Sequence, residues 1–323
     1  MKNLFTYLLI VPIMFLAINC SSDDGGTTPV VVNEAQVLAE YLEANGDFIN
    51  TSAPALISAD DVYQNMLTGA SQYVIDIRAE ADFANGHIQG AVNVSAGNLI
   101  THIEGLTTNY TTIVIACYSG QTASFGTSIL RLLGHDNVKS LKFGMSSWNS
   151  SCANSWSPSI GNPRLAQFVT TSTPKGPVGE LPTLATGEET GDAILASRAA
   201  AVLAEGFGAS AVDHNTVYGN LSNYYIVNYW SADHYNLGHI DGAMQYTPGS
   251  DLKLATALKT LPTDKTIVVY CYTGQTSAHV AAYLKMLGYD AKTLKFGVNA
   301  MAYDMMPSSK WVDTFCKQYP FVQ

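Results

Sequence analysis

The chain has 323 residues, of which 47% are hydrophobic, enough for about two domains with a core each, since domains usually hold about 100 to 200 residues. Lys and Arg number 16 against 26 Asp and Glu, and the formal net charge is −10. This composition excludes a mainly disordered chain. It also argues against nucleic acid as a partner, because no basic stripe is available to neutralise a phosphate backbone.

Residues 1–19 are predicted to be a signal peptide. Lys2 supplies a positive charge, Leu4 to Ile18 is a largely apolar stretch that is short for a permanent membrane helix, and Cys20 follows. The sequence just before and including Cys20 is similar to a bacterial lipobox, although Asn19 stands where a small residue is usual. This implies lipidation of Cys20 and a lipid anchor in the bacterial envelope, on the periplasmic side or at the cell surface. An ordinary signal peptide with a chance cysteine is the alternative.

Both halves of the chain carry the same six-residue motif. Cys117-Tyr118-Ser119-Gly120-Gln121-Thr122 recurs 154 residues later as Cys271-Tyr272-Thr273-Gly274-Gln275-Thr276. With nearly the same offset, Gly86-His87-Ile88 recurs as Gly238-His239-Ile240, and Lys142-Phe143-Gly144 as Lys295-Phe296-Gly297. A repeat of this length is too long for a solenoid and indicates a duplicated domain.

The repeat sets the predicted layout of the chain. Residues 20–33 are predicted to be a flexible tether after a lipidated Cys20, because residues 21–29 are polar and contain glycine. Domain one is predicted over residues 34–165 and domain two over residues 191–323. Residues 166–190 are rich in Thr, Pro and Gly without an apolar period, and they are predicted to be a linker.

Each predicted domain alternates short β-branched runs with helical stretches. Strands are expected at residues 73–77, 112–116, 225–227 and 266–270. Runs that are apolar on both faces are typical of parallel sheets covered by helices. In each half the second strand is followed by the cysteine motif and then by a helical segment, at 124–133 or 278–287. The sequence therefore predicts an α/β fold with each cysteine at the carboxyl end of a strand, where open α/β sheets bind ligands.

These motifs, in this order, resemble a rhodanese domain. Domain one has Asp76-Ile77-Arg78, residues 86–91, the six-residue loop, and Leu141-Lys142-Phe143-Gly144 with Trp148, and domain two repeats most of this pattern. The resemblance implies two tandem rhodanese-like domains, each a central parallel sheet flanked by helices. It also implies a sulfurtransferase that passes sulfane sulfur through a cysteine persulfide. No cofactor and no metal are implied.

Cys117 and Cys271 are the predicted catalytic residues. A thiolate is the nucleophile, and both it and the persulfide anion would be stabilised by loop amides and by the start of the following helix. An inert buried thiol is the alternative for each cysteine. In the loops, the glycines allow the backbone to curl, the threonines could bond the sulfur or close the loop, and the tyrosines could form an aromatic wall or simply pack. The predicted substrate-loop residues are Tyr118, Ser119, Gly120, Gln121, Thr122, Tyr272, Thr273, Gly274, Gln275 and Thr276.

Neither loop contains Arg or Lys, and this narrows the substrate. Phosphate or arsenate would need a bidentate cation, so phosphatase and arsenate reductase chemistry is disfavoured. The same absence argues against a strong preference for thiosulfate, which is also a dianion. A small-molecule or protein persulfide or polysulfide is the better candidate donor, with a thiol as acceptor.

Two supporting residues are predicted in domain one only. Asp76 is expected to accept hydrogen bonds from the loop, and Arg78 to pair with Glu80 or Asp82. Domain two has Asn228-Tyr229-Trp230 at the corresponding place. Cys117 is therefore expected to be the main sulfur carrier, unless two extra polar groups near the mouth of the second loop compensate. These groups are Ser277 and His279.

The remaining cysteines and histidines leave alternatives open. Cys152 and Cys316 lie outside the loops and could pair with each other, resolve the persulfides or stay buried. His87 and His239 are interpreted as architectural residues of the Gly-His-Ile turn. The alternative function is a non-catalytic, lipid-anchored binding or scaffold module of an envelope complex. The presence of both loop cysteines favours the sulfurtransferase.

Overall fold

The computed structural model describes residues 33–323, so the predicted signal peptide and the predicted lipidation site Cys20 lie outside the described residues. The helices are α1 (Glu34–Ala44), α2 (Phe48–Thr51), α3 (Ala59–Thr68), α4 (Glu80–Asn85), α5 (Leu99–Glu104), α6 (Gln121–Leu132), α7 (Met145–Trp148), α8 (Gly191–Ala209), α9 (His214–Gly219), α10 (Ala232–Leu237) and α11 (Gln275–Met286). The strands are β1 (Leu56–Ile57), β2 (Gln72–Asp76), β3 (Val92–Asn93), β4 (Thr112–Ala116), β5 (Val138–Leu141), β6 (Phe168–Val169), β7 (Ala211–Val212), β8 (Tyr224–Tyr229), β9 (His239–Ile240), β10 (Met244–Tyr246), β11 (Thr266–Tyr270) and β12 (Ala291–Leu294).

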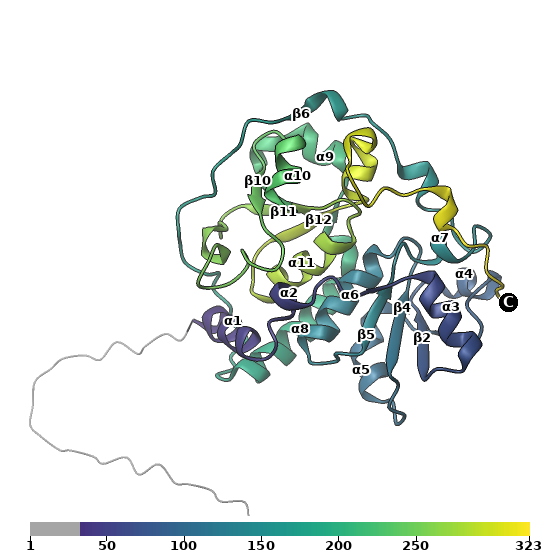
Figure 1. The fold of residues 1–323 in the computed structure, drawn as a ribbon. Coiled ribbons are helices and arrows are strands. Elements are labelled where there is room, and N and C mark those ends of the chain that lie inside the picture. Colours follow the sequence, from purple (N-terminus) through teal and green to yellow (C-terminus); the bar gives the residue numbers. More distant parts are fainter. Residues whose placement is uncertain (1–32) are drawn as a thin grey trace, which may run out of the picture. The chain divides into compact units, whose positions relative to one another are not determined.

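Each half contains a five-stranded sheet with the same topology (Figure 1). The order is β1-β5-β4-β2-β3 in the first half and, read in the same sense, β7-β12-β11-β8-β10 in the second. Every strand pair within these two sheets is parallel. The predicted α/β fold, with a central parallel sheet in each half, is therefore confirmed. In both sheets the central strand, β4 or β11, runs directly into the cysteine loop.

The central strands are apolar on both faces because both faces are covered. In β4, Ile113 and Ile115 enter a core shared by the two halves, whereas Val114 and Ala116 enter a second core with residues of α3 and α7. β11 divides its side chains in the same way between the shared core and a core of the second half. The continuous apolar runs of the sequence follow from this double burial.

The two helices that follow the cysteine loops, α6 and α11, pack against each other. Small side chains on both helices allow this close approach, and the Ser128 hydroxyl of α6 donates to the His279 carbonyl of α11 over 2.8 Å. Both helices start earlier than predicted, at Gln121 and Gln275, because Gly120 and Gly274 adopt left-handed conformations that turn the chain into the helix. The last two residues of each six-residue motif are therefore helical.

The sequence suggested that His279 lies near the mouth of the second loop, but it does not. It is fully buried between the helices, where Nδ1 is 3.0 Å from the Gln275 carbonyl oxygen and the ring lies against Phe48. Burial, above all, lowers the pKa of His279 to about 4. Between about pH 4 and pH 6.5 the histidine is therefore neutral in the folded protein, whereas it is protonated in the unfolded chain.

This burial predicts an acid-sensitive stability. The unfolded chain takes up a proton near the usual histidine pKa of about 6.5, and the folded protein takes it up only near 4. The contribution of His279 is then intact above about pH 6.5 and is lost as the pH falls to about 4, by up to about 3 kcal/mol. In His279→Asn, which keeps a donor for the Gln275 carbonyl, urea unfolding between pH 7 and pH 4 should show a smaller loss of stability. An identical pH dependence in the two proteins would contradict this assignment.

The C-terminal segment, residues 316–323, leaves the second half and packs on the first (yellow in Figure 1). His87 and Val322 exchange two backbone hydrogen bonds of 2.9 and 3.0 Å, and the Tyr319 ring stacks on Tyr63 at 4.0 Å. The final residues of the range predicted for domain two therefore cover domain one. Likewise, the stretch predicted as a linker is bound to the second half, because β6 pairs with β9.

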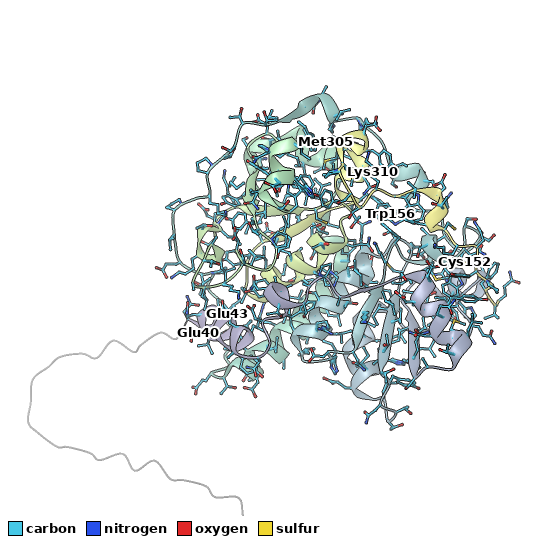
Figure 2. The ribbon with its side chains drawn as sticks, in the orientation of Figure 1. Glu40, Glu43, Cys152, Trp156, Met305 and Lys310 are labelled. Carbon is cyan, nitrogen blue, oxygen red and sulfur yellow. The ribbon has the colours of Figure 1, made fainter. Side chains whose placement is uncertain are left out.

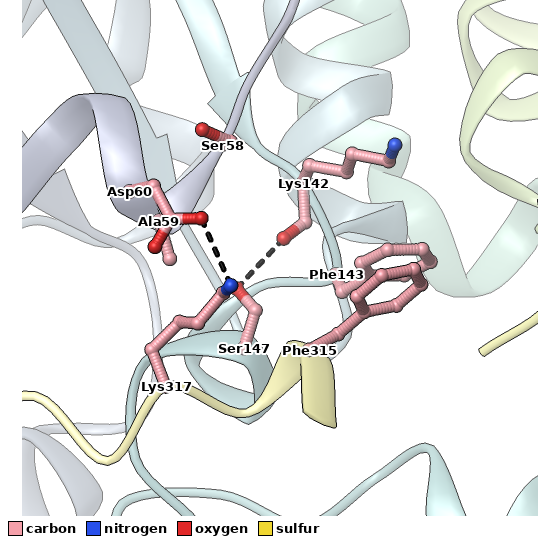
Figure 3. Close-up of a pocket in the computed structure, with 8 residues that line it drawn as sticks. All are labelled: Ser58, Ala59, Asp60, Lys142, Phe143, Ser147, Phe315 and Lys317. Atoms are coloured by element: carbon pink, nitrogen blue, oxygen red, sulfur yellow. Dashed lines mark hydrogen bonds and ion pairs between the residues drawn. The ribbon is translucent and has the colours of Figure 1, made fainter. Parts of the chain in front are cut away.

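A cavity of about 150 Å³ lies where this segment meets domain one (Figure 3). Lys317 closes one side through its ion pair with Asp60, at 2.9 Å, and Phe143 and Phe315 form the apolar wall. The other lining residues are Ser58, Ala59, Lys142 and Ser147. The lining residues come from Phe315, from the C-terminal segment and from the first half of the chain, on which the segment packs. None of them belongs to a cysteine loop.

Candidate active site

Cys117 lies at the carboxyl end of β4, inside the loop that leads to α6. Its Sγ accepts hydrogen bonds from the backbone N–H groups of Gly120 at 3.2 Å and Ala123 at 3.4 Å. Gly120 makes this curl possible, with φ of 83°. The residue is only 2% exposed. The buried sulfur therefore accepts from two backbone amides, one in the loop and one in the first turn of α6.

Burial raises the pKa of the Cys117 thiol, and the backbone amides of Ala123, Ser119 and Gly120 oppose that effect. Desolvation disfavours the thiolate, whereas N–H donors aimed at the sulfur favour any anion that forms there. A persulfide anion at this position would gain from the same donors.

Cys271 occupies the same position after β11. Its Sγ accepts from the Ser277 backbone N–H at 3.3 Å and lies 3.4 Å from the Ser277 hydroxyl. Cys271 is 3% exposed, and Gly274 repeats the left-handed turn with φ of 75°. The two sites share the left-handed glycine and the amide donor that follows the sixth loop residue. The second contact is the Gly120 N–H at Cys117 and the Ser277 hydroxyl at Cys271.

The loop tyrosines are each bonded to the first helix after the neighbouring strand. The Tyr118 hydroxyl donates to Asp82 of α4 over 2.5 Å, and the Tyr272 hydroxyl contacts His234 of α10. Tyr118 is the more exposed of the two tyrosines. These bonds fix the rings beside the cysteine loops, so each tyrosine packs on its own domain.

The other predicted loop residues have different roles. The Ser119 hydroxyl accepts from the Gln121 side chain at 3.1 Å, and the Thr273 hydroxyl accepts from the Gln275 backbone N–H at 3.3 Å. Thr122 and Thr276 lie half-buried in the first turns of α6 and α11. The hydrogen bonds to sulfur come from Gly120 and from the residues after these threonines, Ala123 and Ser277, and not from the threonines.

The side chains of Gln121 and Gln275 each accept a hydrogen bond from the opposite half of the chain, and no sequence pattern predicted this. We call this reciprocal pair of hydrogen bonds the glutamine clasp. The Gln121 Oε1 accepts from the Phe296 N–H, and the Gln275 Oε1 accepts from the Phe143 N–H, both at 2.8 Å. Both phenylalanines have left-handed backbones, with φ of 65° at Phe143 and 59° at Phe296. The hydrogen bonds that their N–H groups donate stabilise these turns. A Cβ on Gly120 would lie 2.5 Å from Gln275 Oε1, and a Cβ on Gly274 would lie 2.4 Å from Gln121 Oε1. Each half of the chain therefore packs directly against the cysteine loop of the other.

An aromatic cluster lies beside this clasp. The Trp156 ring, labelled in Figure 2, contacts both Phe143 and Phe296 edge-on at 5.0 Å, and its Nε1 donates to the Ser119 carbonyl at 3.1 Å. Trp311 stacks on the same tryptophan at 5.7 Å. These rings join the two Lys-Phe-Gly turns to the first cysteine loop. The only sequence signals for the clasp and the cluster were the repeated loop glutamine and the repeated turn.

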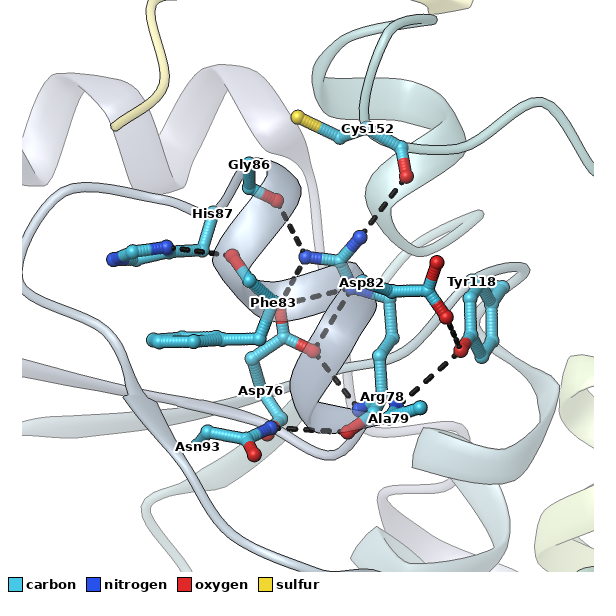
Figure 4. Close-up of polar contacts among 10 residues, drawn as sticks. All are labelled: Asp76, Arg78, Ala79, Asp82, Phe83, Gly86, His87, Asn93, Tyr118 and Cys152. Carbon is cyan, nitrogen blue, oxygen red and sulfur yellow. Dashed lines mark hydrogen bonds and ion pairs between the residues drawn. The ribbon is translucent and has the colours of Figure 1, made fainter. Parts of the chain in front are cut away.

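The Asp76–Arg78 pair differs from its predicted role (Figure 4). Arg78 pairs with Asp76 itself, at 2.7 Å from Nη2 to Oδ2, and not with Glu80 or Asp82. The guanidinium also donates to the carbonyl oxygens of Cys152 at 2.9 Å and Gly86 at 2.7 Å. Both side chains are buried. Asp76 thus orients Arg78, and Arg78 connects the segments at Gly86 and Cys152 to the end of β2. Contrary to the prediction, the carboxylate does not accept hydrogen bonds from the cysteine loop.

Domain two replaces this ion pair with an aromatic arrangement. Asn228 donates to the Tyr270 hydroxyl at 2.8 Å, and Trp230 packs on Tyr270 and Tyr272. Asn228 and Trp230 make different contacts from Asp76 and Arg78, but they are just as buried. The reason given for expecting Cys117 to dominate, a loop held by Asp76 in domain one alone, therefore no longer applies.

Cys152 and Cys316 are free thiols in this structure and are half-buried. Across residues 33–323 there is no group of three or more His, Cys, Asp or Glu side chains placed to hold a metal ion. Nor does any helix within that range have the length and apolar character needed to cross a membrane.

Comparisons with known proteins agree with the fold. The rhodanese-like domain model matches residues 58–151 and 217–303. A thiosulfate sulfurtransferase GlpE of Shewanella oneidensis is 35% identical over 88 residues, which cover 27% of this chain and 86% of that protein. A probable adenylyltransferase/sulfurtransferase MoeZ of Mycobacterium tuberculosis is 42% identical over 74 residues, covering 23% of this chain and 19% of that protein.

Among solved structures, a thiosulfate sulfurtransferase from Pseudomonas aeruginosa is 18% identical with a TM-score of 0.32, covering 87% of this chain and 49% of that one. The family model matches both halves of the present chain, each around one cysteine loop, and together the matches span more than half of its length. The protein therefore belongs to the rhodanese-like family and carries two rhodanese-like domains in tandem, a family that supports a sulfurtransferase kind of function.

Proposed function

We propose that the protein is a sulfurtransferase, or persulfide carrier, in which Cys117 and Cys271 each hold sulfane sulfur as a persulfide. The observation that carries this proposal is that each buried sulfur accepts from backbone N–H groups within 3.4 Å, two at Cys117 and one at Cys271. In the first step a cysteine thiolate attacks the outer sulfur of a donor persulfide, R–S–SH, and R–S⁻ leaves. In the second step an acceptor thiolate attacks the outer sulfur of the cysteine persulfide, and the cysteine thiolate is restored. The sulfur changes hands without net oxidation or reduction.

The proposed donors are small-molecule or protein persulfides and polysulfides, and the proposed acceptor is a thiol. The loops contain no Arg or Lys, so they offer amides but no guanidinium or ammonium group to a substrate dianion. Amide donors suit the single charge of a persulfide. Among the relatives are proteins named as thiosulfate sulfurtransferases, so thiosulfate is the comparison donor for any assay.

The burial of both sulfurs favours a second candidate function. Cys117 and Cys271 are 2% and 3% exposed, and the glutamine clasp presses on both loops. A non-catalytic binding or scaffold module of an envelope complex would keep its thiols closed in this way. A transferase would need the clasp to loosen during turnover.

Intact mass spectrometry separates the two candidates. The purified soluble part is incubated with a persulfide or polysulfide donor, and the mass is read for added sulfur, with the Cys117→Ser and Cys271→Ser variants assigning each addition. A carrier gains sulfur at the loop cysteines and loses it when a thiol acceptor is added. If neither loop cysteine takes up sulfur, the proposed transfer through the loops is wrong and the scaffold function is favoured.

We also propose that the protein is anchored in the bacterial envelope by a lipid on Cys20. The apolar stretch from Leu4 to Ile18, the cysteine after it and the polar residues 21–29 support this proposal. Cys20→Ala should move the protein from the membrane fraction to the soluble fraction of lysed cells. Equal solubility of the wild-type and variant proteins would rule out lipid anchoring.

A further inference from the structure

One side-chain hydroxyl contacts the sulfur of Cys271. Ser277 is fully buried, and its Oγ lies 3.4 Å from Cys271 Sγ and 2.7 Å from the Thr293 Oγ1. The Thr293 hydroxyl, also fully buried, lies 3.3 Å from the Gly274 carbonyl oxygen within the loop. The sulfur is therefore the first member of a short chain of hydroxyl groups that ends on the loop backbone.

Domain one has no hydroxyl at the corresponding place. The residue 154 positions before Ser277 is Ala123, which offers only its backbone N–H to Cys117, at 3.4 Å. The buried hydroxyls nearby, Ser124 and Ser140, bond to each other at 3.0 Å. The two sulfur sites thus share one backbone donor, from Ala123 or Ser277, and differ in their second contact, which is the Gly120 amide at Cys117 and the Ser277 hydroxyl at Cys271.

The chain of hydroxyl groups can serve both protonation states of the sulfur. In the thiol state the S–H donates to Ser277, Ser277 donates to Thr293, and Thr293 donates to Gly274. When the sulfur loses its proton, the Ser277 O–H can turn to the sulfur while the Thr293 O–H turns to Ser277. Each hydroxyl keeps a partner within the distances above, and the anion gains a charge-assisted hydrogen bond.

We propose that Ser277 is a catalytic residue of domain two, whose hydroxyl donates to the thiolate and to the persulfide anion of Cys271 and so increases the fraction of Cys271 in the reactive thiolate form. The proposal rests on the proposed function for its role in sulfur transfer. The underlying contact can be tested without any transfer reaction. The natural difference between the two domains also supplies the matched control, because each domain can be given the residue of the other.

The experiment follows alkylation of one loop cysteine at a time by iodoacetamide, with peptide mass spectrometry, as a function of pH. Ser277→Ala is made in the Cys117→Ser background, and Ala123→Ser in the Cys271→Ser background. Because a hydrogen bond to a charged acceptor usually contributes the equivalent of one to two pH units, Ser277→Ala should raise the pH midpoint for alkylation of Cys271 by about one unit. Ala123→Ser should lower the midpoint for Cys117. Alkylation midpoints that stay unchanged in both variants would overturn the proposal.

A third variant separates contact with sulfur from general disturbance of the site. Thr293→Val removes the second hydroxyl and leaves Ser277 beside the sulfur, so the midpoint for Cys271 should move less than half as far as in Ser277→Ala. Equal shifts in the two variants would assign the effect to packing and overturn the role of Ser277. If the midpoints move as expected but no variant carries sulfur, the proposed function fails while the contact stands.

Discussion

Replacing Cys117 and Cys271 together with Ser is expected to lower sulfur transfer from a persulfide donor to a thiol acceptor by at least about a thousandfold. A serine hydroxyl stays protonated at neutral pH and does not accept sulfane sulfur, so the covalent step is lost in both domains. The loop amides would remain, but they would have no sulfur anion to stabilise. The rate is measured under saturating donor, with the uncatalysed reaction subtracted.

The matched control is the Cys152→Ser and Cys316→Ser double variant, which removes the two thiols outside the loops among residues 33–323. It should keep most of the activity, because neither residue belongs to a cysteine loop. Transfer that survives loss of the loop cysteines and disappears in this control would place the carrier outside the loops and contradict the proposed function.

The two single variants divide the activity between the domains. The sequence favoured Cys117, because only domain one has Asp76 and Arg78. In the structure Asp76 pairs with Arg78 and makes no hydrogen bond to the Cys117 loop, whereas Ser277 lies beside the sulfur of Cys271. Cys117→Ser is therefore expected to keep at least as much activity as Cys271→Ser, and the opposite order would restore the original assignment.

The sequence was informative wherever a contact is local in the chain. The β-branched runs predicted the parallel sheets, and a glycine three residues after each cysteine predicted a loop able to turn its amides toward the sulfur. Those amides are at most six residues from the sulfur they contact. Such contacts depend on backbone geometry that a short motif specifies by itself.

Contacts between distant segments could not be predicted in the same way. Gln121 and Phe296 are 175 residues apart, and their hydrogen bond exists because the domains dock through α6 and α11. The burial of His279 has the same origin. For Arg78, three carboxylates lay within reach along the chain, and the outcome depended on which of them was buried with it. A sequence pattern gives the possible partners but not the docking that selects among them.

Arg78→Leu is expected to have the largest effect on stability, a loss of about 3 to 5 kcal/mol, because it leaves the Asp76 carboxylate buried without its partner. The variant also deprives the carbonyl oxygens of Cys152 and Gly86 of their donor. Arg78→Lys keeps the charge but cannot reproduce the planar fork that contacts Asp76 and both carbonyls, so an intermediate loss is expected. Urea unfolding of each variant measures these changes.

A double-mutant cycle with Asp76→Asn decides how much of that loss comes from the stranded charge. Adding Asp76→Asn to Arg78→Leu removes the uncompensated carboxylate, so the double variant should be more stable than Arg78→Leu alone. Domain two shows that the fold tolerates an uncharged pair here, since Asn228 and Trp230 occupy the equivalent positions in its buried frame. If the effects of the two substitutions simply add, the charges are not coupled in solution, and the main contribution of Arg78 is its bonds to the two carbonyl groups.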